Sequence, residues 1–542
     1  MIDSKEKKMD FKKSSICDKN MNFQECELTI LRSAVDESDK LNKKKIVNND
    51  DIKKILKIVE DFIFKNKLML YGGIAINNIL PKHEQFYDFD LEIPDYDFYS
   101  PDALKHAKEL TDIYYNKGYV EVEAKAGVHL GTYKVFVNFI PIADITQMHT
   151  KIYKTLFKDS LFISGMYYIP VNYLRMSMYL ELSRPNGDVS RWEKVFKRLL
   201  LLNKNYPLKT EKECYKMDFH KNDKESSRED KLYIETRENF ISQGVVFFGG
   251  YATNLYSRYM SFKQRNYLQK FPDFDVLSED SDKSAFILKE DLLRSGFKNI
   301  KIVKHKEIGE IIPYHNEVIV DGKSIAFIYK PIACHSYNKI IIQNKEINIA
   351  TIDTILTFYL SFMYADMKYY DKDRMLCLVT SLFNLEEHNR LSQKGLLNRF
   401  SLNCYGEQKT LEDIRSEKTL KYRELSKNTN SKEYEMWFLK YSPHKLVEKK
   451  NKQEKGKEND QEKGEDNDQD NDQDNDQEKG EDNDQDNDQE KGKEKKEKKE
   501  DKKHLEKEDK NKSKRKHKKI GIEQRLIRKL KTKKNRKSGF LF

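Results

Sequence analysis

Three aspartates in the first half of the chain have the residue type and spacing of a divalent-metal site. Asp95 and Asp97 are separated by one residue, and alternate residues of a strand point to the same face, so their carboxylates should form a pair. Asp144 ends the apolar stretch 135–143, where an unpaired charge would be costly. Three hard oxygen ligands predict a Mg²⁺ site, with Mn²⁺ as an alternative ion, in which Asp95, Asp97 and Asp144 are both metal ligands and catalytic residues.

A pair of glycines precedes these acids. Tyr-Gly-Gly-Ile-Ala-Ile-Asn, residues 71–77, follows a short apolar stretch that is typical of a strand. Glycine allows close approach of the backbone, and the free amides at the start of a helix attract anions. Gly72 and Gly73 are therefore candidate phosphate-binding residues, with a simple tight turn as the alternative interpretation.

A second acidic pair, Asp88 and Asp90, has the same local spacing, and an internal repeat separates the two pairs. Gly-Gly recurs at 249–250, and Pro-Asp-x-Asp-x-x-Ser recurs at 272–278. No acidic residue stands between Tyr251 and Phe271 in this second copy. The repeat therefore favours Asp95 and Asp97, and it predicts that Asp88 and Asp90 are loop acids.

The second copy is expected to lack activity. Asp273 and Asp275 are retained, but Pro-Ile-Ala-Asp at 141–144 resembles Pro-Ile-Ala-Cys at 331–334, which places Cys334 opposite Asp144 in the comparison. Cysteine is a poor magnesium ligand. The second unit is therefore interpreted as non-catalytic, with roles in burying a shared interface and in offering a groove to RNA.

The repeat defines the expected architecture. Helix-period apolar patterns follow each copy, at 171–182 and 192–202 and again at 351–364 and 374–385. The expected fold class is α/β (α+β), with two tandem units of one kind, each with following helices, and a disordered charged C-terminal tail. The expected boundaries are a flexible N-terminal segment at 1–48, a catalytic unit at 49–205, a degenerate unit at 206–445, an acidic low-complexity linker at 446–490 and a basic tail at 491–542.

Charge is unevenly distributed along the 542 residues. There are 17 acidic and 2 basic residues from Glu458 to Glu490, followed by 24 basic and 8 acidic residues from Lys491 to Phe542. The acidic repeat has no apolar residue to bury and is interpreted as a solvated linker. The basic tail could neutralise RNA phosphates or could merely aid solubility or sorting.

One basic helix face could also touch phosphates or simply be solvated: Arg191, Lys194, Lys197 and Arg198.

Other features limit the class of protein. No apolar run reaches the length of a membrane span, and the start of the chain lacks the apolar block of a signal peptide, so neither a membrane protein nor a secreted one is expected. The six cysteines are far apart and include no Cys-x-x-Cys pair. Neither a disulfide framework nor a zinc site is therefore expected, and a reducing compartment fits.

The longer motifs resemble a known family. YGGIAINNILP, IPDYDFYSPDALKHAKEL and EVEAKAGVHLGTYKVFVNFIPIADIT are similar to the poly(A) polymerase catalytic subunit of poxviruses and giant DNA viruses, within the polymerase β-type nucleotidyltransferase superfamily. The resemblance extends over about 52–441, and it implies that the two tandem units are nucleotidyltransferase-like. It implies that Asp95 and Asp97 hold the metals, that Asp144 completes the site near the primer end, and that Gly72 and Gly73 contact the ATP phosphates.

The resemblance also implies substrates and surroundings. ATP would be the donor, the 3′ end of a single-stranded mRNA the acceptor, and the host-cell cytoplasm (viral factory) and the virion the location. A homodimer or a separate processivity partner would keep the enzyme on RNA. Two alternatives remain at this point: a related transferase with another donor or acceptor, and a catalytically silent RNA-binding scaffold.

Overall fold

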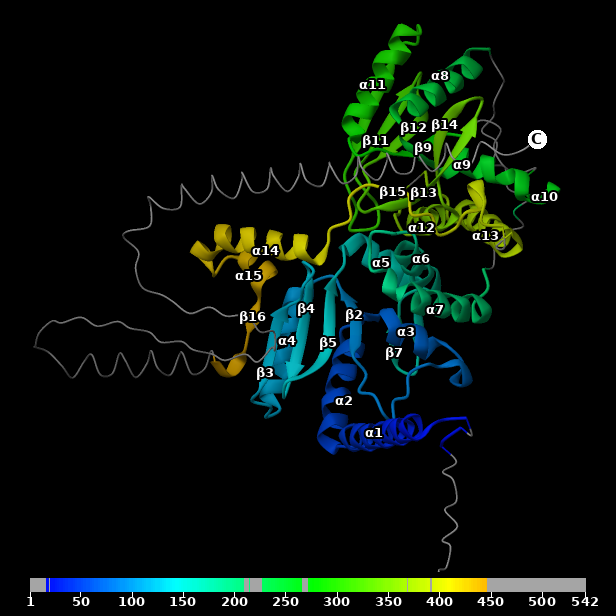
Figure 1. Ribbon diagram of the computed structural model, residues 1–542. Coiled ribbons are helices and arrows are strands. Elements are labelled where there is room, and N and C mark those ends of the chain that lie inside the picture. The colour runs from blue at the N-terminus through cyan, green and yellow to red at the C-terminus, as the bar shows by residue number, and fades with distance from the viewer. Residues whose placement is uncertain are drawn as a thin grey trace, which may run out of the picture. The chain divides into compact units, whose positions relative to one another are not determined.

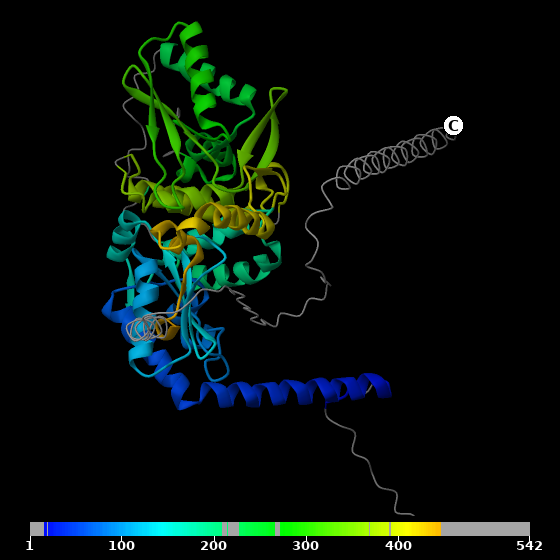
Figure 2. The same ribbon diagram turned by 90° about the vertical axis from the view of Figure 1, so that its left-hand side faces the viewer.

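The computed structural model describes residues 16–445 except 19, 209–213, 215–226, 266–271, 368 and 390–391. The acidic linker and the basic tail therefore lie outside the described residues. Figures 1 and 2 show the described chain as two sheets with their helices, and a long helix at the N-terminal end. That helix, α1 (Phe23–Val47), begins with a capping box between Asn22 and Glu25 and buries no residue. The expected N-terminal segment, 1–48, thus contains a capped helix over 23–47, and its boundary stays a prediction.

The first sheet has eight strands in the order β16-β3-β4-β5-β2-β1-β7-β6. Strands β2 and β5 are parallel neighbours, and β3, β4 and β5 form an antiparallel meander. The bounds are β1 Met69–Leu70, β2 Tyr96–Ser100, β3 Val122–Ala126, β4 Thr132–Val137, β5 Ile140–Gln147, β6 Leu161–Ile163, β7 Met166–Tyr168 and β16 Lys440–Tyr441.

The second sheet repeats this topology, in the order β10-β11-β12-β9-β8-β14-β13-β15. Its parallel pairs, β12 with β9 and β14 with β8, correspond to β5 with β2 and β7 with β1. The predicted fold class of two tandem α/β units is therefore confirmed. The bounds are β8 Val246–Phe248, β9 Phe274–Leu277, β10 Ile300–His305, β11 His315–Val320, β12 Lys323–Tyr329, β13 His335–Ile342, β14 Lys345–Ala350 and β15 Cys404–Tyr405.

The helices follow the apolar periodicity of the sequence. Helix α2 shows the pattern clearly: Asn49 caps it, and Ile52, Ile55, Val59 and Phe62 are buried on one face. In the first unit the helices are α2 Asp50–Lys65, α3 Gly72–Ile79, α4 Ala103–Asn116, α5 Thr150–Lys158, α6 Val171–Leu182 and α7 Trp192–Asn205. In the rest of the chain they are α8 Ser227–Gln243, α9 Gly249–Tyr256, α10 Phe262–Arg265, α11 Ser281–Arg294, α12 Ile352–Phe362, α13 Lys372–Asn389, α14 Leu411–Leu425 and α15 Lys432–Phe438.

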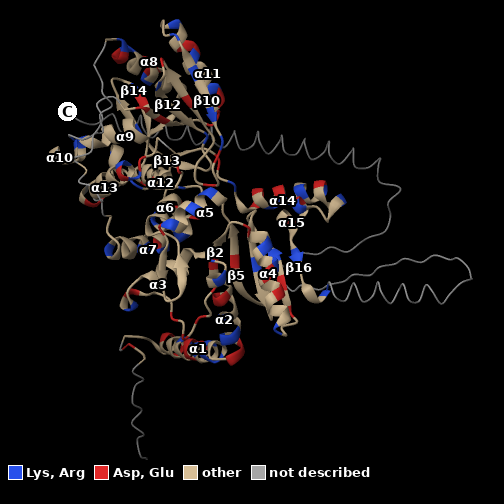
Figure 3. Cartoon of the chain, turned by 180° about the vertical axis from the view of Figure 1, so that it is seen from behind, with Lys and Arg blue, Asp and Glu red and all other residues tan. Residues whose placement is uncertain are grey.

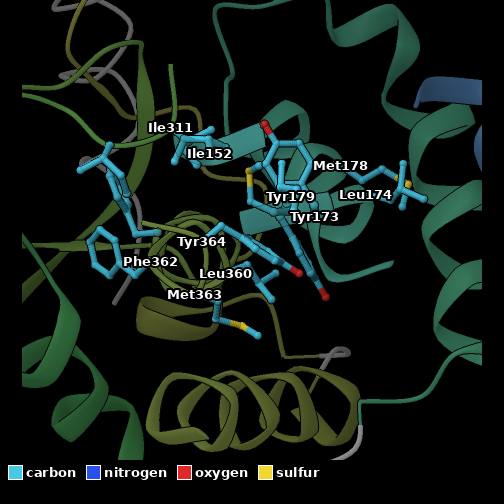
Figure 4. Close-up of a cluster of buried hydrophobic side chains, with 14 of the residues drawn as sticks. Ile152, Tyr173, Leu174, Met178, Tyr179, Ile311, Leu360, Phe362, Met363 and Tyr364 are labelled. Atoms are coloured by element: carbon cyan, nitrogen blue, oxygen red, sulfur yellow. The ribbon is translucent and has the colours of Figure 1, made fainter. Parts of the chain in front are cut away.

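The two units share one hydrophobic core. Figure 4 shows side chains of α6 and α12 meeting there, and the rings of Tyr173 and Tyr364 lie edge to face with centroids 5.8 Å apart. Every residue of α12 is buried. A helix that is buried on every side must be enclosed by protein, and α6 of the first unit supplies part of the enclosure.

After the second unit the chain returns to the first sheet. Strand β16 pairs antiparallel with β3, through Lys440 opposite Lys125 and Tyr441 opposite Ala124. Helix α15 packs on the same strand, and Lys108 forms an ion pair with Glu435 at 2.6 Å. The yellow-orange segment beside β3 and β4 in Figure 1 is this return. The second half of the chain therefore completes the edge of the first sheet.

Cysteine pairing differs from the expectation. Disulfides join Cys17 to Cys26, Cys214 to Cys377 and Cys334 to Cys404, so the expected absence of a disulfide framework is wrong. Spacing along the sequence could not reveal pairs such as Cys214–Cys377, which are 163 residues apart and meet through the tertiary fold. Among the described residues, no helix combines the length and apolar character that crossing a membrane requires.

Candidate active site

The predicted acids lie on two adjacent parallel strands. Asp97 on β2 and Asp144 on β5 are register partners, and Asp95 stands one residue before β2 on the side of the strand that Asp97 occupies. The flanking residues Tyr96 and Phe98 point to the opposite, buried face. Strand alternation and parallel register thus bring all three acidic positions to one face of the sheet.

A β-bulge places a lysine beside Asp144. The β4–β5 hairpin shifts register between Val135 and Phe136, so that Lys134 lies opposite Asp144. The Lys134 ammonium donates to Oδ2 of Asp144 at 2.6 Å. If β4 and β5 kept the register that they have next to the turn, Tyr133 and not Lys134 would lie opposite Asp144. Sequence reasoning missed Lys134, because only the bulged register assigns it to the site.

Crowding of the acids alters their protonation. Burial, followed by the charges of Asp95 and Asp144, raises the pKa of Asp97 to about 7. Partial desolvation and the charge of Asp144 also raise the pKa of Asp95. Burial opposes the charged form of Lys134, but its bond to Asp144 and the surrounding acids outweigh burial, so the pKa of Lys134 is raised. The site therefore favours added positive charge.

The two glycines of the Gly-Gly pair face different neighbours. Gly72 has φ +71°, and a Cβ there would lie 2.9 Å from Oδ2 of Asp97. A Cβ on Gly73 would collide with the Tyr87 hydroxyl and lie 3.0 Å from the Arg198 guanidinium. The start of α3 thus lies between the aspartates on one side and an arginine on the other.

The rival acids have a local role. Asp88 and Asp90 are exposed in the loop that precedes β2, where Oδ1 of Asp88 accepts a hydrogen bond from the Asp90 amide at 3.0 Å. Leu91 and Glu92 donate to the carbonyl of Asp88. This is a self-contained turn, as predicted for loop acids.

The predicted basic face consists of Arg191, just before α7, and three residues on α7, and these side chains have different environments. Lys197 is exposed and paired with Glu193 at 2.6 Å, and Lys194 is exposed. Arg191 pairs with Glu181, and its positive charge offsets a small part of the rise in the Asp97 pKa. Arg198 is half-buried against the Phe86 and Tyr87 rings, beside Gly73. Figure 3 colours the basic residues along α7 blue and the acidic residues on β2 and β5 red.

The second unit has a different set of residues at the matching positions. By strand register, Phe327 lies beside Asp275 as Asp144 lies beside Asp97, so the expected match to Cys334 is wrong. Cys334 lies in the loop after β12. The expected match arose because Pro-Ile-Ala precedes both Asp144 and Cys334 in the sequence. The same bulge recurs in β11–β12, and it places Glu317 opposite Phe327, where the first unit has Lys134 opposite Asp144. The second unit thus lacks the third carboxylate.

The first-unit residues suit a divalent cation chemically. Oδ1 of Asp144 is buried and accepts no hydrogen bond from any described residue, which leaves an acceptor for a ligand. Within the described ranges, no three His, Cys, Asp or Glu side chains are gathered as a metal ion would hold them. Lys134 occupies the other oxygen of Asp144.

Sheet topology, the Gly-Gly helix start and the aligned aspartates together define a nucleotidyltransferase-like fold. Residues 57–188 match the family profile described as poly(A) polymerase catalytic subunit, which confirms the predicted resemblance over the part that carries all five candidate residues. A structure of the Megavirus polyadenylate synthase has the same fold, with TM-score 0.65, 20% identity and coverage of 84% of this chain and 92% of that chain.

Two viral relatives show the same resemblance. A protein of African swine fever virus that carries a provisional assignment as poly(A) polymerase catalytic subunit is 34% identical over 172 residues, which are 30% of this chain and 36% of that protein. One from Acanthamoeba polyphaga mimivirus with the same provisional assignment is 35% identical over 162 residues, 28% of this chain and 26% of that protein. The matched region thus spans about a third of the length of these relatives.

Proposed function

We propose that this chain is a polynucleotide adenylyltransferase that adds AMP from ATP to RNA 3′ ends without a template, using the first unit as its active site. The observation that carries the proposal is the register of β2 and β5, which sets Asp97 beside Asp144 next to the Gly-Gly start of α3. The match at 57–188 covers this whole arrangement. The second unit is a structural partner with no catalytic role.

Asp95, Asp97 and Asp144 would hold Mg²⁺, or Mn²⁺ in its place, on one face of the sheet. Magnesium bound there would lower the pKa of the RNA 3′-hydroxyl and neutralise charge on the triphosphate. The Gly72–Gly73 turn presents the amides of α3 to phosphates. Lys134 balances Asp144 in the metal-free protein and orients its carboxylate. The chain positions these groups before substrates arrive, which is how preorganised sites stabilise developing charge.

The proposal includes a setting for the reaction. The acceptor is single-stranded mRNA, and the place is the viral factory in the host cytoplasm and the virion. A homodimer or a processivity partner would extend contact with RNA, and the basic tail would add salt-dependent affinity.

Primer extension tests the proposal directly. A labelled single-stranded RNA would be incubated with ATP, UTP, CTP or GTP, with and without Mg²⁺, and the products sized. We expect extension with ATP that requires the metal. Preference for UTP would indicate a related transferase, and RNA binding without extension under any nucleotide and metal would indicate a silent scaffold.

Matched variants assign the site. Asp144→Ala should reduce AMP incorporation by at least about a thousandfold, because one metal ligand is lost. The Asp88→Asn, Asp90→Asn double variant has the same spacing of changes but lies in an exposed turn, and it should extend normally. An Asp144→Ala protein that melts like the wild type and extends at the normal rate would rule out the assignment.

A further inference from the structure

The half-buried Arg198 carries a charge that the proposed chemistry has not yet used. Among the described residues, no carboxylate forms an ion pair with it, and the nearby Glu181 is paired with Arg191 instead. Its guanidinium lies over the Phe86 ring, 4.6 Å from the centroid, and donates to the Tyr87 hydroxyl at 2.9 Å. Two aromatic rings thus hold a cation that lacks a carboxylate partner.

This aromatic holder is fixed to the proposed phosphate-binding helix itself. The backbone amides of Phe86 and Tyr87 both donate to Oδ1 of Asn77, at 2.8 and 2.9 Å. Asn77 is fully buried within α3. Helix α3 therefore carries the Gly-Gly turn at its start and also fixes Phe86 and Tyr87, which hold Arg198. The distance between Arg198 and the turn should change little when a ligand binds.

From these contacts we infer that Arg198 binds the triphosphate of the incoming nucleotide. The inference rests on the proposed function and names a substrate-binding residue for the same site. Arg198 adjoins Gly73, while Gly72 adjoins Asp97, so the arginine and the metal-binding acids flank one turn. A triphosphate is long enough to touch both, and guanidinium matches phosphate oxygens in geometry and charge.

The geometry favours the nucleotide over the RNA. At the reacting end, RNA presents a hydroxyl, whereas the nucleotide presents three phosphates. Gly250 of the second unit corresponds to Gly73, and a Cβ there would meet Pro272 instead of an arginine and a tyrosine. The second unit, which lacks the third acid, thus also lacks an arginine beside this glycine. The arginine therefore accompanies the unit that is proposed to be active.

Equilibrium binding tests the inference without relying on turnover. The full chain would be titrated with ATP and Mg²⁺ in the absence of RNA, and separately with inorganic pyrophosphate. We expect Arg198→Met to weaken both ligands about ten- to a hundredfold, through loss of charge-assisted hydrogen bonds. Arg198→Lys, which keeps the charge but loses the fork, should give a smaller loss. Lys197→Met, on the same helix but exposed and paired with Glu193, should bind as the wild type does.

Two results would overturn the inference. One is unchanged ATP affinity in Arg198→Met; the other is weakened binding of a single-stranded RNA with ATP affinity retained. Melting curves of both Arg198 variants show whether they fold, and Arg198→Lys supplies the comparison if Arg198→Met does not. If the wild type binds ATP in an Arg198-dependent way but extends no RNA, the proposed reaction fails while this inference stands.

Discussion

The protonation of the Asp97 carboxylate is strongly affected by its surroundings. This carboxylate lies among two other acids under the Gly72 turn, and these surroundings raise its pKa to about 7. A divalent cation would replace the proton and offset the cost of holding a charged Asp97 beside two other acids. The free protein therefore keeps an acid in an unfavourable position that its proposed ligand relieves, which is a common relation between stability and function.

This cost predicts a pH-dependent stability gain for Asp97→Asn. Because the folded pKa exceeds the unfolded value of about 3.9, the native state binds more protons between these values, and stability falls as pH rises from about 4 to 7. The variant should unfold at the wild-type temperature near pH 4. By pH 8, in EDTA, it should be more stable by about 1–4 kcal/mol.

Thermal unfolding across pH 4–8 checks this, with Asp90→Asn as the exposed control that should follow the wild type. The Asp97→Asn protein should also have lost AMP incorporation. A variant less stable than the wild type at pH 8 would show that Asp97 carries no such penalty.

At the scale of elements, the decisive feature is a hairpin with a bulge that occurs twice. In β4–β5 it sets Lys134 opposite Asp144, and in β11–β12 it sets Glu317 opposite Phe327. The backbone is repeated, but the side chains have lost the acid-rich site. Glu317 is instead held by His305 at 2.9 Å, and Phe327 stacks on Tyr369. In the second sheet, the residues at these two positions contribute to packing and not to a metal site.

This difference predicts that acids of the second unit are dispensable for catalysis. Asp273→Asn and Asp275→Asn should each retain primer extension within about twofold of the wild type, because a carboxylate pair without the third ligand is a poor two-metal site. Initial rates with ATP and Mg²⁺ at saturating RNA measure this. A loss as large as that of Asp144→Ala, in a protein that melts normally, would assign chemistry to the second unit.

The sequence predicts elements better than it predicts registers. The repeated Gly-Gly and Asp-x-Asp motifs, with their apolar periods, predicted two α/β units and the helices that follow them. Phe327 was missed because a similar string drew attention to Cys334, and the bulge that fixes the pairing has no marker in a single sequence. The pairing of β16 with β3 joins residues over 300 positions apart, which local patterns do not encode.

At the scale of the whole folded region, a buried ionic cluster of the second unit contacts the first unit through its arginine. Arg399 donates to both oxygens of the fully buried Asp353 on α12 and pairs with Glu386 on α13. Its guanidinium also lies 5.0 Å from the centroid of the Phe196 ring on α7. One arginine thus touches helices of both units.

Removing this arginine should destabilise the protein strongly. Arg399→Met leaves two carboxylates buried without their cation, and we expect a loss of about 3–5 kcal/mol. Chemical denaturation would measure the loss. Arg258→Met is the control, because Arg258 is an exposed arginine over a tyrosine ring and should cost little. A loss below about 1 kcal/mol for Arg399→Met would mean that the two buried carboxylates do not need this cation.

The pairing of β16 with β3 also bears on how the protein is made. Synthesis proceeds from the N-terminus, and the strand that covers the edge of β3 is supplied by Lys440 and Tyr441. Until the ribosome has passed these residues, the sheet with the proposed active site has a bare edge, the kind of surface that recruits unwanted strands. Completion of the first sheet therefore waits for most of the polypeptide, and an early-terminated product would contain every proposed catalytic residue on an unfinished scaffold.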